Sequence, residues 1–192
     1  MPGHPLRWLL LAAALHVQPA AGLELAGVRL AEDAQVAGRP VSLHSAGVAR
    51  RALLVELYVA TVYLTPQAAP AEFQAREPRR LSITLLRELP AQALDELAGE
   101  VPARIPGDAG ARLQAWLQRV LAQLARQRPL LQRGDTLSLD WSPREGALVL
   151  LNGQRLLDPQ ADPALFQALW QLWLGERPLD AALKTALLQA RR

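Results

Sequence analysis

The stretch RRALLVELYVATVYL, residues 50–64, is the longest run of β-forming residues in this 192-residue chain. No glycine or proline interrupts it before Pro66, and it contains both tyrosines of the protein, Tyr58 and Tyr63. Residues eight positions apart in a regular strand lie on the same face. We therefore predict one strand over 50–64 in which Arg50 and Tyr58 share a face and form a groove for an organic acid.

Apolar periodicity predicts the elements on either side of this stretch. Period-two alternation predicts further strands, at 23–30, 41–44, 79–86 and 135–141. Apolar residues at helical spacing predict a helix that begins near Pro90 and ends before Pro102, and helices that begin near Asp108 and Asp162. Pro178 and Asp180 are predicted to open the last helix. Asn152-Gly153 predicts a two-residue hairpin turn. This order indicates an α+β protein with helices laid on a largely antiparallel sheet.

Residues 1–22 are typical of a secretory signal peptide. Arg7 precedes the apolar run 8–15, and small residues lead to a cleavage site near Gly22. The alternative is a short membrane anchor, but the run is shorter than the roughly 20 residues that a span needs. We expect a signal peptide over 1–22, one domain over 23–192, no stable membrane span, and a periplasmic or secreted protein.

Composition excludes several kinds of chemistry. The chain has no cysteine, so disulfides, thiolate catalysis and cysteine-bound metals are excluded. His44 is the sole histidine after the leader, which leaves neither a metal site nor a catalytic triad. A net charge of +3 arises from 21 basic and 18 acidic residues that are interleaved. We therefore expect no metal, no cofactor and no nucleic-acid partner.

Several motifs, taken in order, resemble the chalcone isomerase-like family in its exported bacterial branch. They are Ala46-Gly47-Val48 followed by 57–64, then 133–140, Asn152-Gly153 and 173–178. Together they span almost all of the chain after the leader. The resemblance implies an open-faced β-sandwich whose large sheet and helices enclose an elongated apolar cleft.

The plant enzymes of that family surround their substrate with a set of polar residues, and most of this set is missing here. The position of the strand threonine falls at Tyr58, the late-helix position falls at Leu172, and the sole asparagine is the turn residue Asn152. Arg50 keeps the family arginine. This pattern is similar to the non-catalytic members, which hold a fatty-acid carboxylate with an arginine and a strand tyrosine.

The candidate ligand-binding residues are therefore Arg50, Tyr58 and Thr61, and none is assigned a catalytic role. Alternatively, Arg50 is an exposed charge that Glu56 neutralises, and Arg51 is then the fallback candidate for the carboxylate ligand. Tyr58 is alternatively a core aromatic residue. Helical spacing places three tryptophans in the core, at Trp116, Trp170 and Trp173. The acids that flank a predicted strand, Asp135 and Asp140, are expected to face water.

The sequence thus predicts an exported protein that binds a small apolar carboxylate, such as a fatty acid, without catalysis. Two alternatives stay open. The first is an intramolecular lyase of the chalcone isomerase type that uses a rearranged polar set around Arg50, Tyr58 and Thr61. The second is a structural or interaction protein of the cell envelope in which side chains fill the cleft.

Overall fold

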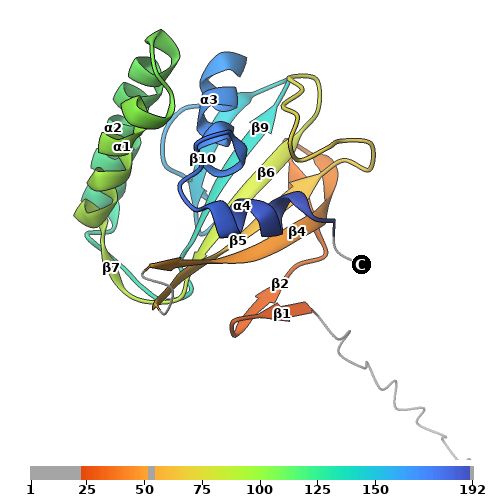
Figure 1. Ribbon diagram of the computed structural model, residues 1–192, viewed down its shortest axis with the longest axis horizontal. Coiled ribbons are helices and arrows are strands. Elements are labelled where there is room, and N and C mark those ends of the chain that lie inside the picture. Colours follow the sequence, from red (N-terminus) through yellow and green to blue (C-terminus); the bar gives the residue numbers. More distant parts are fainter. Residues whose placement is uncertain (1–22, 52–54, 191–192) are drawn as a thin grey trace, which may run out of the picture.

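The computed structural model describes residues 23–51 and 55–190 and is built on a seven-stranded antiparallel sheet (Figure 1). The strands run in the spatial order β11-β10-β9-β6-β5-β4-β3. Their bounds are β3 (Asp33–Val36), β4 (Arg39–Arg51), β5 (Val55–Leu64), β6 (Arg79–Leu85), β9 (Thr136–Ser142), β10 (Gly146–Leu151) and β11 (Gln154–Arg155). Two short hairpins pair β1 (Leu23–Leu25) with β2 (Val28–Leu30), and β7 (Leu89–Pro90) with β8 (Leu130–Leu131).

Helices cover one face of this sheet. A 3-10 turn, η1 (Ala91–Leu94), leads into α1 (Asp95–Arg104) and α2 (Asp108–Gln127), which run side by side at the left of Figure 1. The helices α3 (Pro163–Leu174) and α4 (Ala181–Leu188), drawn in blue, pack against the sheet. The predicted α+β class, with helices laid on an antiparallel sheet, is confirmed.

Side-chain caps fix where the last two helices begin. The Asp162 carboxylate accepts hydrogen bonds from the first free N–H groups of α3, and Asp180 does the same at Leu183 of α4. Both starts agree with the predicted ones. Pro102, by contrast, does not end the first helix, because α1 continues through it to Arg104.

The core lies between the sheet and the helices. Alternate residues of the central strands point into it, including Ala60, Val62, Leu64, Leu81, Leu139 and Val149. The three tryptophans Trp116, Trp170 and Trp173 are each 3% exposed, which confirms that they pack in the core. Several core residues, such as Val101, Leu113 and Leu172, are 0% exposed and are therefore fully enclosed by neighbouring side chains.

The expectation of a single strand over residues 50–64 is wrong. The strand β4 ends at Arg51 and β5 begins at Val55, and these two residues face each other in antiparallel register. Residues 52–54 lie outside the described part. The strands β4 and β5 form an antiparallel hairpin, with Ser42 opposite Leu64 at one end and Arg51 opposite Val55 at the other. Their pairing along most of β5 lets both strands bury an apolar face under the helices. Arg50 and Tyr58 therefore stand on neighbouring strands.

The expectation that Asp135 and Asp140 face water is also wrong, since they are 6% and 4% exposed. Arg80 donates to the two carboxylate oxygens of Asp140 at 2.6 and 2.7 Å, and Arg128 donates to Asp135. A carboxylate can be buried where charged hydrogen bonds replace its hydration. Period-two alternation cannot show this, because it reports polarity and not pairing.

The predicted hairpin turn is present. Asn152 and Gly153 have positive φ angles of 50° and 79° and join β10 to β11. This combination is the conformation that an Asn-Gly turn favours. The Asn152 side chain also bonds to the start of β9, through Asp135 and the Thr136 N–H.

Candidate functional site

Tyr58 lies at the edge of the apolar core, on the face of β5 that meets the helices. The indole Nε1 of Trp173, on α3, donates a hydrogen bond to the Tyr58 hydroxyl oxygen at 3.2 Å. The hydroxyl proton itself has no acceptor in the described part of the chain. A hydroxyl that accepts one hydrogen bond becomes a better donor for another. Tyr58 can therefore donate to an acceptor supplied from outside the protein.

Burial raises the pKa of the Tyr58 hydroxyl above its usual value near 10. The hydrogen bond from Trp173 opposes this rise, and the nearby carboxylate of Asp180 adds to it. The hydroxyl therefore stays protonated at neutral pH. It can act as a hydrogen-bond donor and does not act as a base there.

Arg50 stands at the end of β4, close to the same edge of the core. Its Nη2 donates to the Glu56 carboxylate at 2.7 Å, and the two side chains are 49% and 42% exposed. The predicted neutralisation of Arg50 by Glu56 is therefore present, across the hairpin. Exposed ion pairs of this kind are weak, so the guanidinium can exchange Glu56 for another anion.

Asp180 links the surroundings of Arg50 and Tyr58. The backbone N–H of Arg50 points at the Asp180 carboxylate, with an N···O distance of 3.4 Å. The same carboxylate caps α4 and raises the pKa of Tyr58. A register shift between Ala49 and Arg50 interrupts the regular alternation, so strand spacing does not set where the Arg50 side chain points.

Thr61 is not brought together with Tyr58. The two residues are three positions apart in β5, and their side chains lie on opposite faces of the sheet. On the face of Thr61, Tyr63 packs with Val36 and Val41 in a separate cluster. Thr61 is 5% exposed on that face. Of the predicted set, the structure places only Arg50 and Tyr58 near one edge of the core.

Sequence reasoning missed two neighbours of Tyr58. Trp173 was expected only as a packing residue, and Asp180 only as the start of a helix. Each also has that expected role. The additional contacts arise because α3 and α4 return to the end of the β4–β5 hairpin, which is a tertiary arrangement without a local sequence signal.

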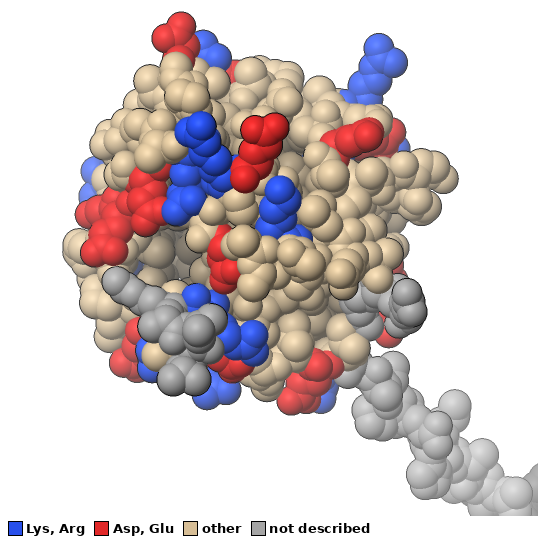
Figure 2. Space-filling view, viewed as in Figure 1, with Lys and Arg blue, Asp and Glu red and all other residues tan. Residues whose placement is uncertain are grey.

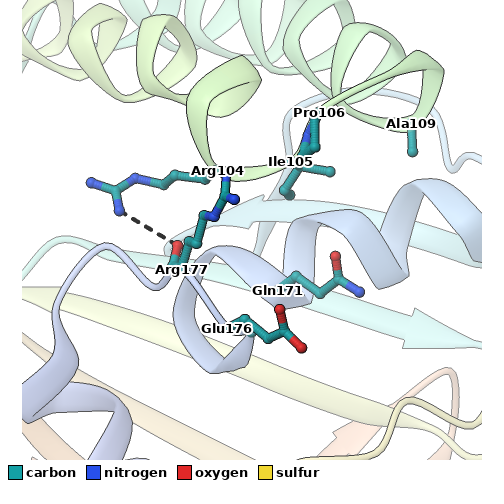
Figure 3. Close-up of a pocket in the computed structure, with 8 residues that line it drawn as sticks. Arg104, Ile105, Pro106, Ala109, Gln171, Glu176 and Arg177 are labelled. Carbon is teal, nitrogen blue, oxygen red and sulfur yellow. Dashed lines mark hydrogen bonds between the residues drawn. The ribbon is translucent and has the colours of Figure 1, made fainter.

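A pocket of about 460 Å³ opens between the α1–α2 corner and the end of α3 (Figure 3). Ile105, Pro106 and Ala109 line one side, and Gln171, Glu176 and Arg177 line the other. Its guanidinium groups already bind protein carbonyls: Arg104 donates to Pro178 at 2.6 Å, and Arg177 donates to Ala103 at 3.2 Å. The pocket therefore offers little unused positive charge to an anionic ligand.

Within residues 23–51 and 55–190 there is no group of three or more His, Cys, Asp or Glu side chains that could hold a metal ion. The same residues contain no helix of sufficient length and apolarity to cross a bilayer. Basic and acidic side chains alternate over the face shown in Figure 2, without a continuous basic surface.

The comparisons with known proteins agree with this architecture. A family model described as chalcone isomerase-like matches residues 22–189, and the chain belongs to that family. No curated protein is similar enough in sequence to count as a match. A crystal structure of an Arabidopsis thaliana fatty-acid binding protein is similar in fold, with a TM-score of 0.64 and 14% sequence identity. The similarity covers 85% of this chain and 92% of that one.

Proposed function

We propose that this protein binds a small apolar carboxylate, such as a fatty acid, and does not transform it. The Tyr58 hydroxyl donates a hydrogen bond to the ligand carboxylate, and the Arg50 guanidinium supplies the positive charge. The observation that carries this proposal is the Tyr58 hydroxyl at the edge of the apolar core, with Trp173 donating to its oxygen and its own proton unused. The fatty-acid binding protein of similar fold gives further support.

The same geometry favours binding over catalysis. Ring closure on an enone needs several donors placed around a developing enolate. The edge of the core near Tyr58 offers one hydroxyl and one guanidinium that Glu56 already holds. Such a pair is sufficient to hold an anion.

Calorimetric titration of the purified protein with dodecanoate tests the proposal. We expect saturable binding, and we expect Tyr58→Phe to weaken it at least tenfold, because a hydrogen bond to a charged group contributes roughly 1.5–3 kcal/mol. Tyr63→Phe is the matched control, since the Tyr63 hydroxyl donates to the Ala31 carbonyl at 3.0 Å on the other face of the sheet. Absence of binding, or equal effects of the two variants, would refute the proposal.

The proposal includes export to the periplasm or beyond the cell. Its support is the signal-like pattern of residues 1–22. Fractionation of cells that express the full chain, followed by N-terminal sequencing, tests this part. We expect the mature chain to begin near Leu23, and a cytoplasmic chain that keeps Met1 would contradict it.

A further inference from the structure

Arg79 is a fully buried arginine on β6. Its side chain lies on the helix-facing side of the sheet and is 0% exposed. Its register partners are Leu64 on β5 and Trp141 on β9, which are both buried and apolar. Arginine is rarely buried to this extent unless a carboxylate neutralises it. None of the ion pairs among the described residues includes Arg79.

Among the described residues, only one nitrogen of this guanidinium has a hydrogen-bond partner. Nη1 donates to the Glu72 carbonyl at 2.7 Å, whereas Nε and Nη2 have no acceptor in the described chain. Nε and Nη2 form one edge of the planar guanidinium, with their N–H bonds nearly parallel. Two unused donors side by side match the two oxygens of a carboxylate.

Other arginines of this protein use the same edge to hold carboxylates. In each, Nε and Nη2 donate together to one acid; the pairs are Arg80 with Asp140, Arg104 with Glu100, and Arg128 with Asp135. The edge that these residues give to an acid is therefore the one that Arg79 leaves without an acceptor. A buried polar edge of this kind requires a partner, because native proteins rarely leave such donors unpaired.

The surroundings of Arg79 are aromatic. Its guanidinium carbon lies 5.1 Å from the centre of the Phe73 ring and 5.2 Å from that of the Trp170 ring. Burial lowers the pKa of Arg79 to about 10, although the charge of Glu77 opposes this shift. The group stays positively charged at neutral pH. The Glu77 carboxylate accepts a hydrogen bond from Thr65 at 2.9 Å and makes no direct ion pair with Arg79.

We propose that the Nε–Nη2 edge of Arg79 binds the carboxylate of a small ligand whose apolar or aromatic body packs against Phe73 and Trp170. The strand neighbours of Arg79, Leu64 and Trp141, are apolar and offer no polar groups to replace the water shell of a strongly hydrated anion. Such an anion is therefore excluded. A compact organic carboxylate satisfies both requirements, because its head matches the edge and its body matches the rings.

The segment 65–78 covers this site through Glu72 and Phe73, so a ligand reaches the Arg79 edge only when the segment moves away. Core side chains hold its backbone carbonyls in place: Trp170 donates to Pro70 and Trp141 donates to Ala75, both at 2.9 Å. The segment contains no helix or strand. Its displacement therefore breaks side-chain hydrogen bonds and leaves the sheet intact.

This site is separate from the one at Tyr58. Along β5, Tyr58 pairs with Leu85 and Leu64 pairs with Arg79. The two sites are thus six residues apart on the strand, which is about 20 Å at 3.4 Å per residue. Either site can exist without the other.

A titration of the wild-type protein with benzoate, followed through the ¹⁵N–¹H signals of arginine Nε groups, tests the proposal. Arg79→Lys keeps the charge but loses the planar edge, and it identifies the Arg79 signal. We expect benzoate to move this signal in a saturable manner and to raise the melting temperature. We also expect Arg79→Lys to weaken benzoate binding at least tenfold, while Arg76→Lys, on the exposed part of the covering segment, binds as the wild type does.

Three outcomes would overturn the proposal. The first is an Arg79 signal that benzoate leaves unmoved, which indicates that internal water alone satisfies the edge. The second is an equal response to benzamide, the neutral analogue of the same shape. The third is an equal response to chloride at the same ionic strength. Tyr58→Phe should leave the benzoate response unchanged, so failure at this site and failure at the Tyr58 site are distinguishable.

Discussion

Arg80 and Asp140 face each other across β6 and β9, and the guanidinium reaches the two carboxylate oxygens at 2.6 and 2.7 Å. The pair lies on the sheet face that the helices do not cover. Arg80 also donates to the Gln35 carbonyl on β3 at 3.1 Å, so it connects the centre of the curled sheet to its edge. On the same face, the hydroxyls of Ser82 and Ser138 bond at 3.0 Å.

Removal of one partner of this pair should destabilise the fold. We expect Asp140→Asn to lower the free energy of unfolding by about 2–3 kcal/mol, because it leaves the Arg80 charge largely buried without its counter-charge. The double variant Arg80→Met/Asp140→Leu should recover most of this loss. Urea denaturation measures both. Glu56→Gln, at the exposed pair with Arg50, is the control and should change the free energy by less than about 0.5 kcal/mol.

Asp135 should make the stability depend on pH in the acid range. Burial alone would raise the pKa of its carboxyl, but hydrogen bonds from Arg128 and from the Gln132 N–H lower it below its usual value. A carboxyl whose pKa is lower in the folded state stabilises the fold above its unfolded pKa near 3.9, and this contribution is lost as the pH falls through the folded pKa.

We therefore expect Asp135→Asn to lose stability at pH 7 and to show a shallower loss between pH 4 and pH 2 than the wild type. Urea denaturation at a series of pH values measures this difference. Asp158→Asn is a suitable control, because Asp158 lies in the connection after β11. The prediction would be contradicted if the free energy of unfolding fell equally steeply between pH 4 and pH 2 in the wild type and in Asp135→Asn.

Gly47 allows α4 to approach β4 closely. A Cβ at this position would lie 2.8 Å from Leu183 Cδ1 and 2.9 Å from Ala186 Cβ. The leucine can rotate, but the alanine Cβ moves only with its helix. We expect Gly47→Ala to cost about 1–3 kcal/mol in the free energy of unfolding, as overpacking does.

The matched control is Gly99→Ala in α1, where an added Cβ meets nothing within 4 Å. That variant should stabilise the protein by about 0.5–1 kcal/mol through helix propensity. If both alanine variants shift the urea midpoint in the same direction, the close packing of α4 on β4 is not what requires Gly47.

The charge of Asp180 should weaken binding of a carboxylate at Tyr58. Asn at position 180 keeps a side-chain oxygen for the Leu183 N–H and removes the negative charge beside Arg50 and Tyr58. We expect Asp180→Asn to tighten dodecanoate binding by roughly 2–5-fold, in line with a weak, partly screened charge interaction. This prediction rests on the proposed function.

Asp162→Asn tests whether the effect is specific, since Asp162 caps α3 at the end opposite to Trp173. It should leave the dissociation constant unchanged. Tighter binding in both variants would indicate a change in net charge and not a local effect at Tyr58.

Local patterns predicted most of the sheet and helices but not the charged contacts. Alternation located β6 and β9, Asn152-Gly153 located the turn, and Asp162 and Asp180 located two helix starts. Each of these features is determined within a few residues. The division of the run 50–64 between β4 and β5 was missed because the run carries no glycine, proline or asparagine, so only the pairing of the two strands reveals it.

Buried charges were missed for a different reason. Arginine and aspartate are mostly exposed in proteins, so a sequence reading assigns them to the surface unless their partners are known. The partners of Asp135 and Asp140 come from other elements, and Arg79 is enclosed by a segment that precedes β6 and by α3. Such burial can be recognised only after the tertiary structure is known.

The pairing of β4 with β5 has a consequence for the evolution of the proposed binding pair. Arg50 and Tyr58 lie on two neighbouring strands, so their separation in the chain depends on the number of residues between Arg51 and Val55. Residues inserted or deleted between Arg51 and Val55 would alter that separation while both strands keep their register. Relatives can therefore differ in the sequence separation of this arginine and tyrosine and still place them at the same end of the sheet. A motif of fixed length would overlook such relatives.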